Sequence, residues 1–540
     1  MNQALNLLKN LGLMYCCVAL PAWAVGAPDA GTIQNQIEQT LRPPAAPPVS
    51  PLKPAHVDSS PASGVMVTVT GFDFVGNTLI PTDVLAGATQ QYLDRPLTLA
   101  QLREAGDVVQ QLYKDAGWMV QVHLPPQEID RGRVKISVVE ARLGKIIWVG
   151  KAERVKAEVL DALVRAQLRV GEPVRQDRLE RALLLLNDLP GVSSSASFSQ
   201  GEKAGQTDLV IEVADKSMYS GSMGLDNMGS SVTGTSRATA NLNINSPFAL
   251  GDLISISALY TEGSHYGRLG YGLPIGNDGW RAGAHVTEMG YSAVSGAQSF
   301  KGNANTLGLD WSYPLLRSQQ QNLTFNGSWD KKKFRNINAL DGGSDFGIQV
   351  GLAGLTANVL DAWAGGGANN AALTLTSGQV KANTQLSDPS TAGQFTKWLL
   401  SLSRVQTVTS NLSATVSGQV QRANKNLDSS EKLYLGGAYG VRAYPNSEGG
   451  VSDGQTLTAE FNYKLDAALT TGVFYDYGHG DNPAVPALSS TMKGPGLSVT
   501  WQPVPSMLFK AIAAHRVGDV QNTTSIYSAN RFWLSAQYFF

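Results

Sequence analysis

Leu412-Ser413-Ala414-Thr415-Val416-Ser417-Gly418-Gln419-Val420-Gln421 alternates apolar and small polar side chains at every second position. Because successive side chains of a β-strand point to opposite faces of the sheet, this segment predicts a strand with one apolar and one polar face. Similar alternating segments recur as far as Phe540, with Gly, Asn, Asp and Ser turns between them. Their polar faces are rich in Ser, Thr, Asn and Gln, which is typical of a transmembrane β-barrel with lipid outside and water inside.

The alternating region spans residues 216–540 and contains no helical pattern. A membrane strand takes about 9–11 residues, and with its turns and loops we assign about 20 residues to each strand. The region therefore predicts about sixteen strands, to within about two, which would enclose an aqueous lumen. Spanning by strands also agrees with the rest of the chain, because no internal run reaches the ~20 apolar residues that a spanning helix needs.

The N-terminus has the pattern of an export signal: a basic residue, a short apolar core and the small residues of Ala22-Trp23-Ala24. We expect residues 1–24 to be removed, with a second candidate cut after Ala27. The alternative is a buried helix, for which the run is short. Both cysteines, Cys16 and Cys17, lie inside this segment. The mature chain would then have neither disulfides nor a cysteine metal site.

Residues 28–42 predict a short amphipathic helix with Thr32 as its N-cap. The apolar stripe of this helix repeats every four residues, at Ile33, Ile37 and Leu41. So narrow a stripe cannot stabilise a lone helix in water, so the helix either stays disordered or docks in a polar, confined place. Residues 43–64 are rich in Pro, Ala and Ser and predict an extended linker.

Residues 65–142 predict a small domain with the order β-α-α-β-β. Its second helix begins with a capping box at Thr98 and Gln101 and ends at Gly117. Residues 143–215 repeat the same order, so two consecutive units of about 75 residues form an internal repeat. The alternative is one larger α/β domain.

Several stretches are similar to one protein family in both order and spacing. They are Tyr113–Trp118 with Leu124–Gln127 and Gly132–Ile136, then Leu435–Pro445, then Gly472–Gly478. These resemble, in turn, the first POTRA domain, the conserved loop and the Phe-x-Asp-x-Gly strand motif of the two-partner secretion outer-membrane transporters, the haemolysin-activator and filamentous-haemagglutinin type. The resemblance covers essentially the whole chain. It implies a mainly β fold with two periplasmic POTRA domains before a barrel in the bacterial outer membrane.

The family's loop motif corresponds here to Val441, Arg442, Ala443 and Tyr444. Most members have Gly where this chain has Ala443. If that position needs a positive φ, alanine would cost about 1 kcal/mol or more. We expect the loop to sit slightly differently here but to keep its function.

The partner of this loop would lie on the barrel wall, at Phe474, Asp476 and Gly478. Alternation along Leu469–Tyr477 places Phe474 and Asp476 on the lumen side. A carboxylate there can receive the planar fork of Arg442 through two parallel hydrogen bonds. The resemblance implies the same arrangement, an extracellular loop folded into the pore and latched to the wall. The alternative is that Arg442 and Asp476 are unrelated lumen charges.

We expect the POTRA units to bind an unfolded exoprotein by adding it to an open sheet edge. The candidate edge strand is Trp118–Leu124, with Trp118, Val120, Val122 and Leu124 as its alternate side chains. The helix with Ile33, Ile37 and Leu41 is the candidate plug of the pore. The resemblance also implies that folding of the exported protein outside the cell drives transport.

No motif indicates an enzyme, a cofactor or a metal site. The G-x-S-x-G match at Gly450–Gly454 lies in a glycine-rich loop without the helix that a hydrolase elbow needs. The six histidines lack metal-ligand spacing, and no nucleotide-binding loop is present. A net charge of −1 gives no basic field for nucleic acid. Lys331-Lys332-Lys333 is expected to be a solvated loop or lumen face rather than a binding patch.

The predicted function is secretion of one large exoprotein of the adhesin or haemolysin type through an outer-membrane pore, without nucleotide hydrolysis. The expected partners are that exoprotein and outer-membrane lipid, and the pore is expected to act as a monomer. Two alternatives remain open: a barrel-assembly insertase of the same superfamily, and a passive porin for small solutes.

Overall fold

The computed structural model describes residues 29–41, 66–203, 205–295, 298–338, 343–384, 386, 388–446, 448–482, 489–518 and 528–540. The predicted signal peptide, residues 1–24, and the predicted linker, residues 43–64, lie outside the described residues. Within the described ranges, none of the helices is long and apolar enough to cross a membrane.

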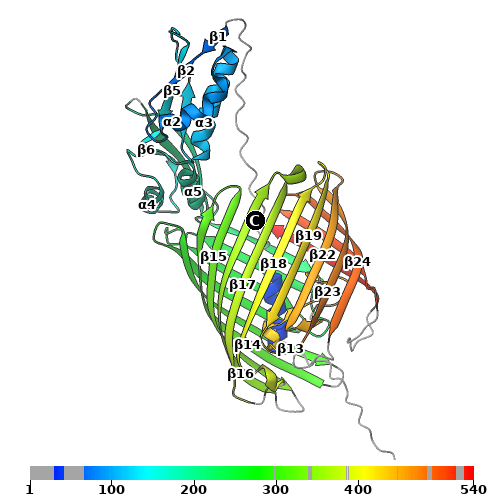
Figure 1. The fold of residues 1–540 in the computed structure, drawn as a ribbon. Helices are drawn as coiled ribbons and strands as arrows, with labels where there is room; N and C mark the ends of the chain where they lie inside the picture. Colours follow the sequence, from blue (N-terminus) through cyan, green and yellow to red (C-terminus); the bar gives the residue numbers. More distant parts are fainter. Residues whose placement is uncertain are drawn as a thin grey trace, which may run out of the picture.

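Sixteen antiparallel strands of the described chain close into one barrel (Figure 1). Each strand pairs with the next along the barrel, and β26 pairs with β9 to complete the circle. The strands are β9 (Tyr219–Asp226), β10 (Arg237–Asn245), β11 (Leu253–Thr261), β12 (Ser264–Ile275), β13 (Trp280–Ser295), β14 (Gln298–Arg317), β15 (Gln321–Asn338), β16 (Ser344–Asp361), β17 (Gly367–Ala382), β18 (Gly393–Thr407), β19 (Leu412–Ala423), β22 (Asp453–Lys464), β23 (Leu469–Asp481), β24 (Ser490–Val504), β25 (Met507–His515) and β26 (Asn530–Phe539). The predicted fold class and strand number are confirmed.

The strands alternate between the two sides of the wall as their sequences predict. In β23, Val473 and Tyr475 are 53% and 46% exposed on the outside, whereas Phe474 and Asp476 are buried toward the lumen. Strand length varies around the barrel, from 8 residues in β9 to 20 in β14. The wall is therefore much taller on the β14–β17 side than at the seam between β9 and β26.

Two α/β units precede the barrel (Figure 1). The first contains β1 (Met66–Val69), β2 (Gly71–Val75), α2 (Thr82–Thr89), η1 (Gln90–Tyr92), β3 (Arg95–Thr98), α3 (Leu99–Asp115), β4 (Val120–His123) and β5 (Arg133–Glu140). The second contains β6 (Arg142–Lys151), α4 (Ala157–Gln167), α5 (Gln176–Asn187), β7 (Val192–Gln200) and β8 (Gln206–Asp215). The three-stranded sheets have the orders β2-β5-β4 and β6-β8-β7, so the two units share one topology.

Helix α3 begins as its sequence predicts. Thr98 accepts a hydrogen bond from the Gln101 backbone N–H, and the Gln101 side chain returns one to the Thr98 backbone, which completes the capping box. The chain leaves the helix at Gly117, where φ is +81°, a value that glycine adopts without strain.

Glu140 ties the first unit together at the end of β5. Its carboxylate accepts hydrogen bonds from the backbone N–H groups of Thr78 and Leu79, both at 2.7 Å, and from the Tyr113 hydroxyl at 2.8 Å. Burial alone would raise the pKa of Glu140, but these donors outweigh it and lower the pKa below its ordinary value. Burial and the Glu140 charge raise the pKa of Tyr113.

Helix α1 (Ala30–Leu41) lies inside the barrel, against β13, β14 and β15 (Figure 1). Its N-cap is Asp29, whose carboxylate accepts from the Thr32 backbone N–H at 3.0 Å and from the Thr32 hydroxyl at 2.7 Å. The prediction of Thr32 as the N-cap was therefore wrong by one turn, because Asp29 offers a better acceptor at the true first turn.

The chain between β19 and β22 also enters the barrel. It forms η4 (Ser429–Glu431), a short strand β20 (Leu433–Tyr434) and its partner β21 (Gly450–Val451). We call residues 424–452 the lumen loop. Two further short helices, η2 (Trp363–Gly365) and η3 (Pro389–Thr391), lie in turns between barrel strands.

Candidate functional site

Arg442 in the lumen loop is bound to two carboxylates of the barrel wall. Its Nε and Nη2 donate to the two oxygens of Asp476 on β23, each at 2.8 Å. Its Nη1 donates to Glu460 on β22, also at 2.8 Å. Arg442 is only 6% exposed and Asp476 only 1%. The two parallel hydrogen bonds to Asp476 are the geometry in which Arg exceeds Lys.

Arg442 and Asp476 make further contacts with the wall and with each other. Asp476 also accepts from the Arg442 backbone N–H at 3.0 Å and from Thr458 at 2.9 Å. The guanidinium carbon of Arg442 lies 3.2 Å from the ring centroid of Phe474. Trp533 on β26 donates its indole N–H to the Arg442 carbonyl at 2.8 Å. The loop is thereby fixed to β22, β23 and β26 at once.

Sequence reasoning did not find Glu460, Thr458 and Trp533. Alternation places each of them on the lumen side of its strand, but nothing in the sequence gives the register between β22 and β23, which sets Thr458 opposite Asp476 and Glu460 opposite Phe474. A search for inward-facing charges near Asp476 would have needed that register.

The neighbours of Arg442 are packed rather than strained. Val441, Ala443 and Tyr444 are all buried, and Ala443 does not have a positive φ. The strain anticipated for alanine at this position is therefore not present. A methyl group added to Gly478 would lie 3.0 Å from Val441, so Gly478 gives the loop room to approach the wall. A methyl group added to Gly494 would likewise lie 2.6 Å from the Ala443 side chain, so Gly494 also leaves room for the loop.

Helix α1 fills another part of the lumen. Ile33 and Ile37 are each 5% exposed and join a cluster of inward-facing apolar residues of the wall, with Leu41 packed at its edge. At the two ends, the Ala30 N–H donates to Asn336 at 2.8 Å, and Arg237 donates to Thr40 at 2.9 Å.

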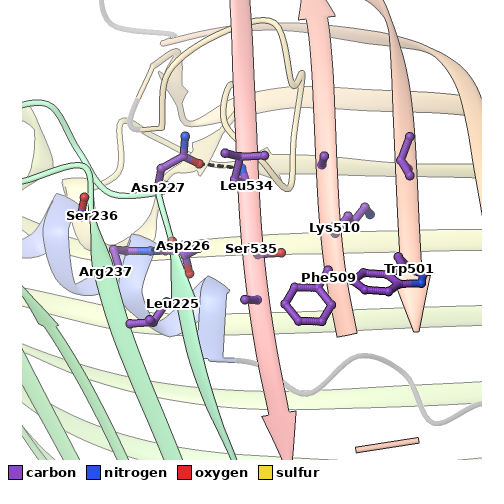
Figure 2. Close-up of a pocket in the computed structure, with 13 residues that line it drawn as sticks. Leu225, Asp226, Asn227, Ser236, Arg237, Trp501, Phe509, Lys510, Leu534 and Ser535 are labelled. Carbon is purple, nitrogen blue, oxygen red and sulfur yellow. Dashed lines mark hydrogen bonds and ion pairs between the residues drawn. The ribbon is translucent and has the colours of Figure 1, made fainter. Parts of the chain in front are cut away.

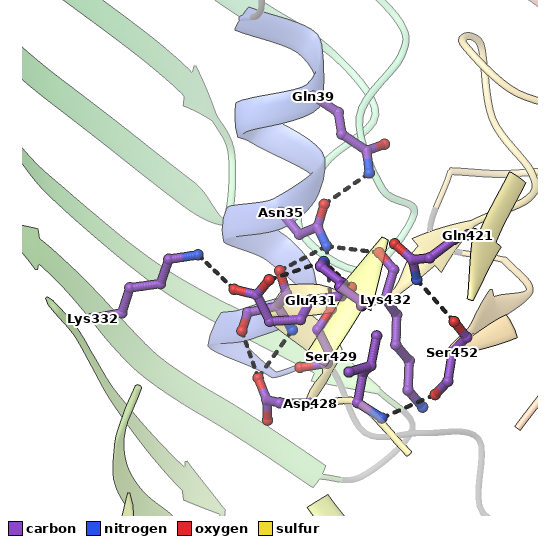
Figure 3. Close-up of polar contacts among 12 residues, drawn as sticks. Asn35, Gln39, Lys332, Gln421, Asp428, Ser429, Glu431, Lys432 and Ser452 are labelled. Carbon is purple, nitrogen blue, oxygen red and sulfur yellow. Dashed lines mark hydrogen bonds and ion pairs between the residues drawn. The ribbon is translucent and has the colours of Figure 1, made fainter. Parts of the chain in front are cut away.

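The helix is also bound to the lumen loop (Figure 3). The Asn35 side-chain amide donates to the carbonyls of Ser430 at 2.9 Å, Lys432 at 3.1 Å and Ser429 at 3.4 Å. The Tyr434 hydroxyl donates to Thr32 at 2.9 Å. The helix and the loop therefore form one connected unit inside the pore.

Glu431 of the lumen loop anchors the helix and the loop to the barrel wall. It pairs with Lys332 of β15 at 2.8 Å (Figure 3). It also pairs with Lys397 of β18 at 2.9 Å. Of the run Lys331-Lys332-Lys333, only the central lysine faces the lumen, because neighbouring side chains of a strand point to opposite sides. Lys331 and Lys333 are exposed on the outer wall.

The candidate POTRA edge differs from its prediction. Strand β4 is an edge strand of its sheet but spans only Val120–His123. The side chains of Trp118, Val120, Val122 and Leu124 pack against the core of the first unit, so they do not face a partner. Before β4, Trp118 bridges to Arg175 of the second unit, whose guanidinium carbon lies 5.1 Å from the indole ring. On β4, the exposed side chains are Gln121 and His123.

A pocket of about 600 Å³ lies beside the seam between β9 and β26 (Figure 2). Five residue pairs join these two strands, and two backbone hydrogen bonds between Gly221 and Phe540 extend the pairing at one end. At the other end, the Asn227 backbone N–H donates to the Leu534 carbonyl at 3.2 Å, while the Asn227 side chain accepts from the Leu534 N–H at 2.8 Å and donates to the Phe532 carbonyl at 3.0 Å. Arg237 and Asp226 pair at 2.7 Å at this pocket.

The G-x-S-x-G stretch has a structural role. Ser452 is fully buried, accepts from the Leu427 N–H at 3.0 Å and donates to Asn482 at 3.0 Å. The segment leads into β22, without the helix of a hydrolase elbow. In the described ranges, no group of three or more His, Cys, Asp or Glu side chains is arranged to hold a metal ion.

Comparison with known proteins connects this geometry to a family. A family model described as haemolysin secretion/activation protein ShlB/FhaC/HecB matches residues 205–497, and one described as POTRA domain, ShlB-type, matches residues 67–141. The heme/hemopexin transporter protein HuxB of Haemophilus influenzae (strain 86-028NP) is 26% identical over 485 residues, 85% of this chain and 84% of that protein. The outer membrane transporter CdiB of Dickeya dadantii is 22% identical over 460 residues, 78% of each.

The fold has a close counterpart among solved structures. CdiB from Escherichia coli superposes with a TM-score of 0.69 at 19% sequence identity, over 91% of this chain and 94% of that one. At this level of identity the similarity concerns the fold.

Proposed function

This chain belongs to the haemolysin secretion/activation protein family of the ShlB/FhaC/HecB type, the outer-membrane transporters of two-partner secretion, and from that membership we propose how it exports its partner. The barrel lies in the bacterial outer membrane and the POTRA domains lie in the periplasm. The partner is one large exoprotein, which passes through the lumen in an extended form, and the chain itself performs no catalysis.

The observation that carries the proposal is a pore occupied by a helix that, among the described residues, makes no backbone–backbone hydrogen bond to the wall or to the lumen loop. Helix α1 packs on the lumen wall through Ile33 and Ile37 and contacts the lumen loop through Asn35. It acts as a plug that leaves before the exoprotein passes. The loop is the second movable part, and the pair of Arg442 and Asp476 is its latch to the wall.

Capture of the exoprotein begins at the edge of the first POTRA unit. Because the apolar side chains of β4 face the core, recognition uses the strand's backbone together with Gln121 and His123. An added strand gains main-chain hydrogen bonds, which suits an unfolded chain of varied sequence. The Ala141 N–H donates to the Met119 carbonyl, so by antiparallel alternation the N–H of Val122, and not that of Gln121, faces the open edge. Val122→Pro should weaken this binding, since it removes that backbone donor.

The test is reconstitution of secretion in a heterologous bacterium. The chain is co-expressed with a candidate large exoprotein from the same bacterium, and that exoprotein is measured in the medium. We expect export only when both are present, and none with an exoprotein from an unrelated pair. Uptake of small solutes without export would indicate a passive porin, and restored assembly of other outer-membrane barrels would indicate an insertase.

Deletion of residues 28–42 separates the plug from the rest of the proposal. We expect it to raise channel conductance in planar bilayers, because the lumen loses the helix that fills it. Unchanged conductance would rule out a plug but leave the secretion function standing.

A further inference from the structure

Basic side chains gather on the outer wall of the barrel, at one end of its tallest part. They are Lys301 on β14, Lys331, Lys333 and Arg335 on β15, and Lys381 on β17, and all of them are exposed. We call these five residues the outer-wall basic belt. The strand register places them on the lipid-facing side, because Lys331 lies opposite Leu307, and Trp329 lies opposite Leu309. Leu307 and Leu309 are 52% and 48% exposed on that side.

The belt lies at the extracellular end of the barrel. The second POTRA unit contacts the opposite ends of these strands, where Arg317 pairs with Asp188 and the Gln319 N–H donates to Glu180. Strands β14, β15 and β16 have 20, 18 and 18 residues, whereas about 9–11 suffice to cross the bilayer. These strands therefore continue well beyond the hydrocarbon core.

The belt begins where the continuous apolar wall ends, at the level of Leu307, and Ile337 is the exposed apolar side chain that β15 presents beyond that level. Trp329 is an aromatic residue of the kind that marks the membrane interface. At ~3.3 Å per residue, Lys331, Lys333 and Arg335 lie about 7 to 20 Å further along β15 than Trp329. That is the level of the lipid headgroups of the outer leaflet.

The belt's charges are not neutralised by the described part of the protein. None of its five basic groups takes part in an ion pair or side-chain hydrogen bond recorded there, in contrast to Lys332 between them, which pairs with Glu431 in the lumen (Figure 3). Two acidic residues share the outer face. Asp345 lies opposite Arg335, and Glu288 lies on β13, two strands away from Lys333.

Gly347 leaves a gap in the middle of the belt. It lies opposite Lys333 on one side and Lys381 on the other, so these two lysines flank a position without a side chain. Adjacent strands are ~4.8 Å apart, so the two lysine backbones are about 10 Å apart. A methyl group on Gly347 would meet only the Lys332 carbonyl, at 3.4 Å, so the gap is open to the outside.

We propose that the outer-wall basic belt binds the phosphate groups of the anionic glycolipid that forms the outer leaflet of the bacterial outer membrane. Clusters of Lys and Arg beside an apolar membrane surface attract anionic headgroups, and Arg335 can bind a phosphate through two hydrogen bonds. The acyl chains of the same lipid would lie on Leu307, Leu309 and Trp329. On the opposite wall, corresponding outward positions of β22–β24 are Gln455, His479 and Thr491, with Lys493 as a single lysine.

Binding is tested with the purified full-length protein in detergent and with bis-phosphorylated lipid A. Lipid retained by the protein is quantified by native mass spectrometry. The triple variant Lys331→Glu, Lys333→Glu, Arg335→Glu should retain at least about tenfold less lipid than wild type, since three charges that attract anionic headgroups become charges that repel them. Lys493→Glu, on the other wall, should bind as wild type does.

A single position gives a matched pair of variants. Gly347→Glu places a carboxylate between Lys333 and Lys381 and should weaken lipid A binding, whereas Gly347→Gln has the same shape and should not. Heat-modifiable electrophoretic migration shows that each barrel is folded. Should the triple variant fail this check, the Gly347 pair decides the outcome.

Three comparison ligands identify the source of the phosphate. Dephosphorylated lipid A, phosphatidylglycerol and inorganic phosphate should each bind weakly or fail to compete. Equal retention of lipid A by wild type and the triple variant would overturn the proposal. So would equal binding of the dephosphorylated lipid or of phosphatidylglycerol, or displacement of lipid A by inorganic phosphate.

Discussion

Arg442 shares its charge between Asp476 and Glu460, so substitutions at the three positions differ in their consequences. Arg442→Ala leaves two carboxylates facing each other in a buried site, and such loss typically costs 3–5 kcal/mol. Asp476→Asn keeps the pair of Arg442 with Glu460 and should cost about 1–3 kcal/mol. We expect Arg442→Ala to lower the unfolding temperature of the barrel more, as followed by heat-modifiable migration. An equal or larger drop for Asp476→Asn would contradict the shared geometry.

A charge swap at this latch needs a third change. In Arg442→Asp with Asp476→Arg, the new carboxylate at 442 would lie beside Glu460. Partial rescue of secretion is therefore expected only when Glu460→Gln is added, which removes the repulsion. The double swap without it serves as the matched control.

Glu140 makes the first POTRA unit sensitive to acid. Its pKa in the folded chain is lower than its ordinary value of 4.5, so the stabilisation it contributes is fully present above that value. The stabilisation is lost as the pH falls through the folded pKa, because the protonated group no longer binds the Thr78 and Leu79 amides as a carboxylate. Hydrogen exchange in the full-length protein should show weaker protection of these amides at about pH 3 than at about pH 6. Glu140→Gln should remove most of this difference, and a difference that persists in it would exclude Glu140 as the cause.

The sequence predicted the position of some residues of the latch between the lumen loop and the wall, but not of others. Alternation along one strand is local, so it placed Asp476 on the lumen side without further information. The meeting of Arg442 with Asp476 came from the family resemblance, and Trp533 was not predicted, because it reaches Arg442 only after β26 closes the barrel. Whether position 443 needs a positive φ could not be read from the sequence, because the path of the loop backbone is not encoded by residue types alone.

At the scale of elements, α1 shows how a weak helix is stabilised by its surroundings. A single apolar stripe could not hold it in water, and in the barrel Ile33 and Ile37 meet inward-facing apolar residues of the wall. The sequence predicted this stripe and its need for a confined site. It could not predict that the helix would bind the lumen loop through Asn35, since the partners there are backbone carbonyls.

Asn35→Asp should loosen this contact. The amide that donates to three loop carbonyls is replaced by a carboxylate, which would face the carbonyls of Ser430 and Lys432 without a proton to share. We expect more frequent open events in planar-bilayer recordings than for wild type. Gln39→Ala is the control, because the Gln39 amide donates to Asn35 but, among the described residues, not to the loop, and alanine brings no charge next to Asn35. Equal opening of the two variants would mean that the loop does not retain the helix.

At the scale of the whole molecule, the second POTRA unit is joined to one side of the barrel's periplasmic rim. Arg317 binds Asp188 through two hydrogen bonds, at 2.9 and 2.7 Å, and Gln167 donates to Asp278 at 2.8 Å. The internal repeat was visible in the sequence, but this joint was not. Gln167 and Arg317 are the last residues of α4 and β14, and Asp188 follows directly after α5, so these positions lie at the ends of elements. No sequence periodicity relates such positions to one another.

Export requires helix α1 to leave the lumen, so a covalent bond between α1 and the lumen loop should stop export. A Cβ built at Gly31 would be in direct contact with the Ser429 hydroxyl oxygen, which puts Gly31→Cys and Ser429→Cys within reach of a disulfide. Under oxidising conditions the double variant should secrete no exoprotein and show low conductance, and a reductant should restore both. Each single cysteine variant should respond to the reductant no more than wild type does, which separates the effect of the cross-link from the crowding that a side chain at position 31 causes. Normal secretion with the disulfide verified by mass spectrometry would mean that the exoprotein passes while α1 stays bound to the lumen loop, and the plug mechanism would have to be abandoned.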